Sequence, residues 1–93
     1  MLTEKFDLET LYEVRKKLYE IQEWSFDQKN DHQELYHIID GLCRVANMYN
    51  DVVVQAIRDN EIFTADPQRY IENKLKASYH AYENKKTNQK SFY

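Results

Sequence analysis

The sequence predicts an all-α fold: a small three-helix antiparallel bundle with a basic C-terminal tail. Three observations support this prediction. The chain has one glycine and one proline among its 93 residues, whereas the turns of β-rich folds depend on both residue types. Apolar residues recur at helical spacing in three stretches, and polar segments with helix-start and helix-stop residues separate these stretches. A long helical hairpin that dimerises into a four-helix or larger bundle is the competing arrangement.

The first helix is expected from about residue 8 to residue 24. Asp7 stands before it and can accept hydrogen bonds from the N–H groups of the first turn. An apolar stripe then recurs at spacings of three and four, formed by Leu11, Val14, Leu18 and Ile21. Because the other side of the helix is charged, the stripe is predicted to face the core.

The second helix is expected from about residue 31 to residue 59, with Asp31 as its cap and Glu34 completing a variant of the capping box. Its apolar side consists of Leu35, Ile38, Ile39, Leu42, Val45, Ala46, Tyr49, Val52, Val53, Ala56 and Ile57. Its solvent side is marked by Asp40, Arg44, Asn47, Asp51, Gln55 and Arg58. An apolar side this wide predicts a central helix that both other helices cover.

Gly41 lies in the middle of this helix, on the flank of the apolar side. Glycine costs about 1 kcal/mol relative to alanine at such a position, so we expect a neighbouring helix to approach closely there. Asn60 is expected to end the second helix in the left-handed conformation. Ile62 and Phe63 are then expected to anchor the connection to the third helix in the core.

The third helix is expected from about residue 67 to residue 84. Asp66 can cap it, and Pro67 suits the first helical position, where no N–H group is needed. Its apolar stripe is thinner and more aromatic, and consists of Ile71, Leu75, Ser78, Tyr79 and Tyr82. Residues 1–84 are predicted to form a single domain, and residues 85–93 a flexible basic tail.

Charge is distributed unevenly along the chain, although the formal net charge is only −3. Residues 1–66 hold 7 basic and 14 acidic side chains, a net charge of −7, whereas residues 67–93 hold 6 basic and 2 acidic ones, a net charge of +4. Such a split can draw copies of the chain together or let either part meet a partner.

The sequence predicts a cytoplasmic protein without a membrane partner. Cys43 is the only cysteine, so no internal disulfide can form, which is typical of a reducing compartment. The first residues lack the pattern of a signal peptide. No stretch approaches the roughly 20 apolar residues that a spanning helix needs.

Few residues could carry chemistry. Glu34-x-x-His37 matches half of the di-iron bundle motif, but that site needs a second such motif and two further glutamates. Cys43 has no neighbouring base in the sequence and is expected to behave as a small buried hydrophobe. No catalytic residue, metal site or cofactor is therefore predicted. A metal-dependent enzyme that uses Glu34, His37 and a further carboxylate is kept as the second alternative.

Glu20-x-x-Glu23 resembles the first part of the magnesium site of small all-helical nucleotide pyrophosphohydrolases. The second part would have to be His37-x-x-Asp40, which places a histidine where Mg²⁺ prefers oxygen ligands. A solvated carboxylate face is the favoured interpretation of these glutamates.

Nucleic acid is not the expected partner. One basic segment, with Lys74, Lys76, Lys85, Lys86 and Lys90 among tyrosines, could contact phosphates. However, glutamates surround the Arg15-Lys16-Lys17 run and cancel its field, and no helix-turn-helix signature is visible.

Aromatic side chains beside the apolar stripes are the remaining signal, because tyrosine is enriched at protein–protein interfaces. The residues predicted to contact a partner are Tyr12, Tyr19 and Trp24 on the first helix, and Tyr79 and Tyr82 on the third. The predicted function is that of a small protein-binding regulatory module. It would be a regulator, inhibitor or immunity protein of the phage or mobile-element type that docks on a partner protein. A structural homo-oligomer, in its simplest form a homodimer, is the first alternative.

Overall fold

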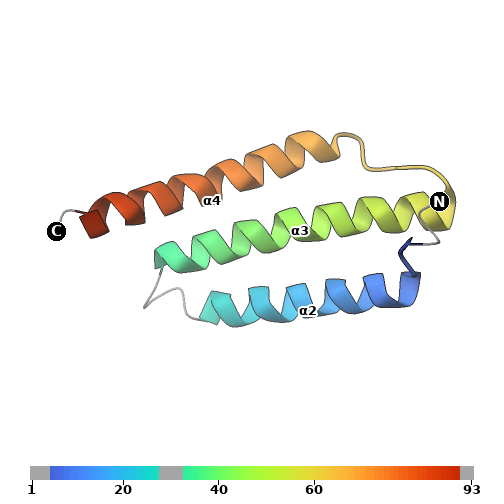
Figure 1. The fold of residues 1–93 in the computed structure, drawn as a ribbon, viewed down its shortest axis with the longest axis horizontal. Coiled ribbons are helices and arrows are strands. Elements are labelled where there is room, and N and C mark those ends of the chain that lie inside the picture. The colour runs from blue at the N-terminus through green and yellow to red at the C-terminus, as the bar shows by residue number, and fades with distance from the viewer. Residues whose placement is uncertain (1–4, 28–32, 91–93) are drawn as a thin grey trace.

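The computed structural model describes residues 5–27 and 33–90, with side chains as far as residue 86. Three α-helices follow one another in antiparallel order (Figure 1): α2 (Leu8–Asp27), α3 (Gln33–Asp59) and α4 (Pro67–Lys90). No strand is present in the described part of the chain. The all-α, three-helix prediction is therefore confirmed.

Two helices are longer than the sequence pattern indicates. α2 continues to Asp27 instead of ending near residue 24, and α4 continues to Lys90 instead of ending at 84. Residues 85–90, which were predicted to lie in the basic tail, are therefore helical. No glycine or proline follows Pro67 to stop α4, and lysines near a helix C-terminus interact favourably with the helix dipole. The expected cap Asp31 and the last three residues lie outside the described ranges.

The predicted helix-start and helix-stop residues act as expected. Asp7 Oδ1 accepts a hydrogen bond of 3.0 Å from the backbone N–H of Thr10 at the start of α2. Asp66 Oδ1 accepts one of 3.0 Å from the backbone N–H of Arg69 at the start of α4. Asn60 follows α3 with a φ of 59°, the left-handed conformation that ends many helices.

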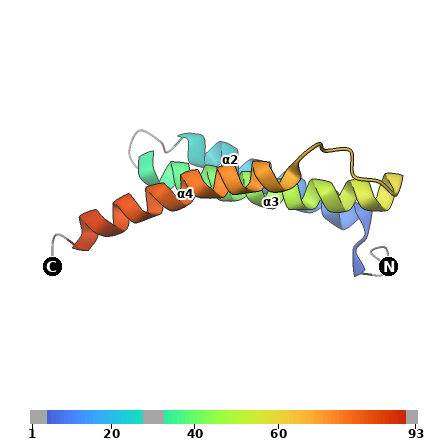
Figure 2. The same cartoon turned by 90° about the horizontal axis from the view of Figure 1, so that it is seen from above.

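The helices form one open layer with α3 in the middle. α2 and α4 each pack on α3, and their described residues do not contact each other; Figures 1 and 2 show the layer from its face and from its edge. The chain measures 51 × 24 × 21 Å and has a radius of gyration of 15.9 Å, whereas a compact domain of this length has about 12 Å. α3 is central, as predicted, but much of it stays uncovered.

We call the contact between α2 and α3, and that between α3 and α4, the two seams. Most of the side chains buried in them are small or polar. The buried polar residues are Ser25, Asn47, Asn50 and Ser78, and the buried apolar ones are Leu11, Cys43 and Val54. The prediction that Asn47 lies on the solvent side is wrong, since only 6% of it is exposed. Small side chains allow the helix backbones to approach closely, but they bury little apolar area.

Gly41 and Ser78 mark the closest approach of α3 and α4. A Cβ atom at Gly41 would overlap the Ser78 hydroxyl and would lie 3.1 Å from the carbonyl oxygen of Lys74. The Ser78 hydroxyl lies 3.3 Å from the carbonyl oxygen of Ile38 and 3.4 Å from that of His37, to which it can donate. The prediction that another helix approaches closely at Gly41 is confirmed.

Polar contacts, not apolar anchors, hold the connection between α3 and α4. Ile62 is 47% exposed and Phe63 is 62% exposed, so the prediction that they anchor the connection in the core is wrong. Instead, Gln55 Oε1 accepts hydrogen bonds from the backbone N–H groups of Phe63 (2.7 Å) and Thr64 (3.1 Å). Gln55 Nε2 donates to the Thr64 hydroxyl at 2.9 Å. One side chain thus meets the hydrogen-bonding needs of the turn, and no apolar packing is required.

Candidate protein-binding surface

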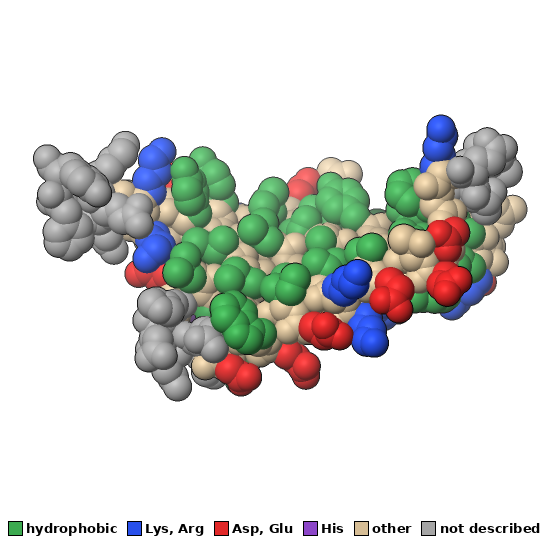
Figure 3. Space-filling view, turned by 60° about the horizontal axis from the view of Figure 1, so that its bottom comes forward, with side chains coloured by type: hydrophobic (Ala, Val, Ile, Leu, Met, Phe, Trp, Pro, Cys, Tyr) green, Lys and Arg blue, Asp and Glu red, His purple; other side chains and the backbone are tan. Residues whose placement is uncertain are grey.

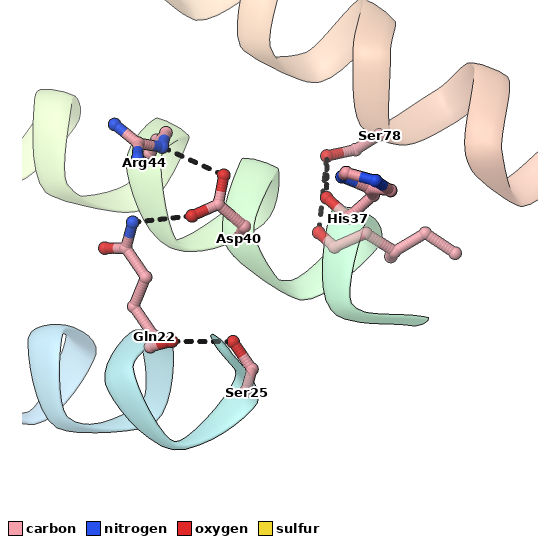
Figure 4. A network of polar contacts seen from close by, with 7 residues as sticks. Gln22, Ser25, His37, Asp40, Arg44 and Ser78 are labelled. Carbon is pink, nitrogen blue, oxygen red and sulfur yellow. Dashed lines mark hydrogen bonds and ion pairs between the residues drawn. The ribbon is translucent and has the colours of Figure 1, made fainter. Parts of the chain in front are cut away.

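One face of the layer holds a groove between α2 and α4, with α3 as its floor; we call it the polar groove because a network of polar side chains lies at its centre. The groove has a volume of about 430 Å³. At its centre Asp40 accepts two hydrogen bonds, from Gln22 Nε2 at 2.7 Å and from Arg44 Nε at 2.9 Å (Figure 4). The groove is lined by Tyr19, Gln22, Glu23, Phe26, Tyr36, Asp40, Arg44, Asn47, Met48, Asp51 and Tyr70.

Asp40, Arg44 and Asp51, three of the charged residues of this groove, are paired within the chain. Each carboxylate oxygen of Asp40 has a donor, and Arg15 Nε lies 3.7 Å from Asp51 Oδ1. Hydrogen bonds from Arg44 to Asp40, and then to Tyr70, raise the pKa of the Arg44 guanidinium, which therefore stays charged. In the described part of the chain, no three His, Cys, Asp or Glu side chains are grouped so that they could hold a metal.

Asn47 differs from its neighbours in the groove, because its buried Nδ2 and Oδ1 have no hydrogen-bond partner among the described residues. Asn50, one turn further along α3, donates from Nδ2 to the carbonyl oxygen of Leu11 at 3.0 Å. Both amides lie at or near the seam with α2. A buried amide without a partner costs free energy, so Asn47 marks a weak point of the fold and not a strong contact.

The opposite side of α3 is apolar and uncovered. At 100° per residue, the groove residues Asp40 and Arg44 and the seam residues Gly41 and Asn50 occupy one part of the helix circumference. The remaining part carries Leu35, Ile39, Leu42, Ala46, Tyr49 and Val53. Leu35 is 39% exposed, Leu42 is 48% exposed and Tyr49 is 60% exposed. α2 and α4 leave these three side chains exposed, whereas Ile39, Ala46 and Val53 are half-buried.

Both outer helices extend this surface. On α2, Val14 and Ile21 lie on the side away from the groove residue Tyr19 and are 40% and 49% exposed. On α4, the helical spacing places Leu75, Tyr79 and Tyr82 on the side away from the groove residue Tyr70; they are 44%, 56% and 44% exposed. We call the whole surface the apolar face: Val14, Leu18, Ile21, Leu35, Ile39, Leu42, Ala46, Tyr49, Val53, Ile71, Leu75, Tyr79 and Tyr82. Figure 3 shows hydrophobic side chains gathered in a band along the molecule, with charged side chains along one edge.

The structure divides the residues predicted to contact a partner between different surfaces. Tyr79 and Tyr82 lie together on the apolar face, with ring centroids 5.6 Å apart. Tyr19 lines the polar groove, and Tyr12 lies on the same side of α2, where it forms a hydrogen bond with Arg58 that raises the pKa of the guanidinium. Trp24 is 60% exposed near the end of α2, beside Glu20 and Glu23. These five aromatic residues therefore do not form one surface.

The sequence pattern predicts a core position for several large residues that are exposed in the structure. Leu42, Tyr49 and Ile21 were expected to be covered by other helices of the chain. The signal that could have revealed them is the width of the apolar side of α3, which two small-residue seams cannot cover. Glu34 and His37 belong to no group of three potential metal ligands in the described structure.

No helix in the described ranges has the length and apolar character needed to cross a membrane. No protein-family model matches the sequence, and no curated protein or solved structure is significantly similar to it.

Proposed function

We propose that this chain is a small protein-binding module whose working surface is the apolar face. The single observation that supports the proposal is the reversal of ordinary burial. Ser25, Asn50 and Ser78 are buried between the helices, while Leu42, Tyr49 and other large apolar residues of the apolar face remain exposed. A contiguous exposed apolar surface on a small protein usually marks an interaction site.

The exposed area of the chain fits a missing interface. A monomer of 11.3 kDa exposes about 5,700 Å², whereas this chain exposes 7256 Å². A stable protein–protein interface buries about 800 Å² on each partner, so the excess of about 1,500 Å², which is spread over the whole open layer, leaves room for one such interface. With only three buried apolar side chains among the described residues, a chain of this size needs association to complete its core.

The partner has a defined chemistry. The apolar face is formed by ridges of helical side chains without a charge at its centre, so the matching surface is apolar and helical. The module acts by occupying that surface, as regulators and inhibitors encoded by phages and mobile elements do. We place it in the cytoplasm, where the buried thiol of Cys43 stays reduced.

The test compares the native complex of the wild-type chain with that of Leu42→Glu in cells that express the protein. The wild-type chain is expected to elute from a sizing column in a complex heavier than one chain. Leu42→Glu places a carboxylate in the centre of the apolar face and is expected to release the single chain. His37→Glu introduces the same residue on the other side of α3 and should leave the complex intact. A complex that persists with Leu42→Glu contradicts the proposal.

A further inference from the structure

We propose that the protein covering the apolar face is a second copy of this chain. The two α3 helices lie parallel and in register about a two-fold axis that runs along them. This inference rests on the proposed function, because it names the partner of the same surface. Four features of the described residues support it: a heptad repeat, the absence of charge along that repeat, the charges of the outer helices and the exposed area.

α3 carries a heptad repeat that is exposed at Leu35, Leu42 and Tyr49 and half-buried at its other positions. Ile39, Ala46 and Val53 are spaced by seven, and so are Leu35, Leu42, Tyr49 and Ala56; the two series alternate at spacings of four and three. In coiled-coil terms, the first series occupies the a positions and the second the d positions. β-branched residues at a with leucine at d favour parallel two-stranded pairing. The repeat lies on the uncovered side of α3, so a second α3 can reach it.

The positions beside the repeat are free of charge. Ile38, Val45 and Val52 precede the a residues. Cys43 and Asn50, on the other flank, are buried at the seam with α2. Between residues 35 and 57, every charged residue of α3 lies away from the repeat: Asp40, Arg44 and Asp51. Two identical faces can therefore meet without like charges opposing each other, which self-association requires.

The outer helices select the parallel arrangement. A two-fold axis along α3 places α2 of one copy on the same side as α4 of the other. α2 has 5 acidic and 3 basic residues, a net charge of −2, and α4 has 6 basic and 2 acidic residues, a net charge of +4. An axis across the helices would instead place α2 beside α2 and α4 beside α4. Opposite charges favour the first arrangement, and like charges disfavour the second.

The area agrees with a dimer of this kind. Each copy exposes about 1,500 Å² more than a compact monomer of its size, which is about twice what each partner loses in a standard interface. Leu35, Leu42 and Tyr49, which are exposed in one copy, lie at the centre of the proposed interface.

The first experiment is sedimentation of the purified chain at micromolar concentration. We expect a mass twice the 11.3 kDa of one chain. Leu42→Glu should weaken the dimer by about a hundredfold or more, because it buries two carboxylates at the axis. His37→Glu should sediment as the wild type does. A wild-type chain that is folded and monomeric overturns the inference.

The second experiment remains informative if Leu42→Glu fails to fold. In a Cys43→Ala background, Leu35→Cys places one thiol at the end of the repeat, and His37→Cys serves as the control. A parallel dimer in register brings the two Leu35→Cys thiols together, so an oxidant should link this variant at least tenfold faster than the control. An antiparallel dimer would instead bring residue 35 of one copy near residue 56 of the other. If Leu35→Cys forms a disulfide with an Ala56→Cys chain and not with a second Leu35→Cys chain, the parallel arrangement is overturned.

The two proposals fail in different ways. In one outcome, the purified chain is a monomer, but cells contain a heavier complex that Leu42→Glu abolishes. This outcome overturns the second copy as the partner, while the proposal of a protein-binding module stands. If Leu42→Glu changes neither the mass of the purified chain nor the complex in cells, both proposals are overturned.

Discussion

The two faces of the helical layer solve opposite problems. In the polar groove, Asp40 joins Gln22 and Arg44 by hydrogen bonds of 2.7 and 2.9 Å, so its charge is satisfied within the chain. On the apolar face, Leu42 and Tyr49 remain 48% and 60% exposed, with nothing of the same chain over them. The charge at the centre of the groove is satisfied within one copy, whereas the large side chains of the apolar face are left exposed. Hydrophobic periodicity thus shows which sides of a helix are apolar, but not which of these sides the other helices of the chain cover.

The seams between the helices explain why the apolar face is left over. Gly41 and Ser78 allow α3 and α4 to approach closely, and Ser25 and Asn50 fill the seam with α2. Apolar burial stabilises by roughly 25 cal/mol per Å², so seams of small and polar residues contribute little. Several large apolar side chains, which could contribute most, remain exposed outside the seams.

Gly41→Leu is expected to destabilise the fold more than any of the changes described below, because it disrupts the seam between α3 and α4. The added side chain would overlap the Ser78 hydroxyl and press on the carbonyl oxygen of Lys74. Overpacking of this kind costs about 2 kcal/mol, even after the gain in helix propensity. Urea denaturation at one fixed protein concentration measures the loss, since association contributes to stability.

A double-mutant cycle locates the effect of Gly41. Gly41→Ala alone should destabilise the chain, because its Cβ atom meets the Ser78 hydroxyl. In a Ser78→Ala background, the same change should cost at least 1 kcal/mol less, in the manner of coupled neighbours (about 0.5–3 kcal/mol). Equal costs in the two backgrounds would mean that the close approach of α3 and α4 at this point does not exist in solution.

The two buried asparagines near the seam with α2 are expected to contribute differently to stability. Asn47 and Asn50 are almost equally buried, at 6% and 7% exposure, but only Asn50 donates a hydrogen bond, to the carbonyl oxygen of Leu11. Because a satisfied hydrogen bond contributes about 1 kcal/mol, Asn50→Ala should lower the free energy of unfolding by about that much more than Asn47→Ala does. Thermal and urea unfolding of the two variants measure the difference.

Each asparagine variant is the matched control of the other, since both lose the same atoms at similar burial. Dimer mass should be unchanged in both, because neither residue belongs to the apolar face. A larger loss for Asn47→Ala would show that the Asn47 amide has a partner in solution, and the ranking of the two positions would then be wrong.

The local features of the fold could be predicted from the sequence, and the arrangement of its surfaces could not. Capping by Asp7 and Asp66, the left-handed Asn60 and the close approach at Gly41 depend on neighbouring residues or on the absence of a side chain, which a sequence shows directly. Asn47 was assigned to solvent and Leu42 to the core, and both assignments were reversed. Which part of a wide apolar side the other helices cover depends on seam geometry, and the seams follow the small residues instead of the large ones.

The smallest expected effect is the contribution of the buried Cys43 thiol to the pH dependence of stability. Burial, and secondarily the negative charge of Asp40, raise the pKa of the Cys43 thiol above 9.0. The folded chain therefore keeps this proton at a pH where the unfolded chain releases it, so the free energy of unfolding should fall as pH rises above about 9. Cys43→Ala should show a smaller decline, and the difference between the two chains is the contribution of the thiol.

Thiol labelling at pH 8 extends this prediction from the seam to the apolar face. Wild-type Cys43 is 6% exposed and protonated, so it should react slowly with iodoacetamide. Leu42→Cys in a Cys43→Ala background moves the thiol by one position, onto the apolar face. If a second copy covers that face, this thiol should also react slowly at high protein concentration and faster on dilution, whereas Cys43 should not change. Fast labelling of Leu42→Cys at every concentration would mean that the face stays open, and the contrast between the polar groove and the apolar face would then describe a monomer.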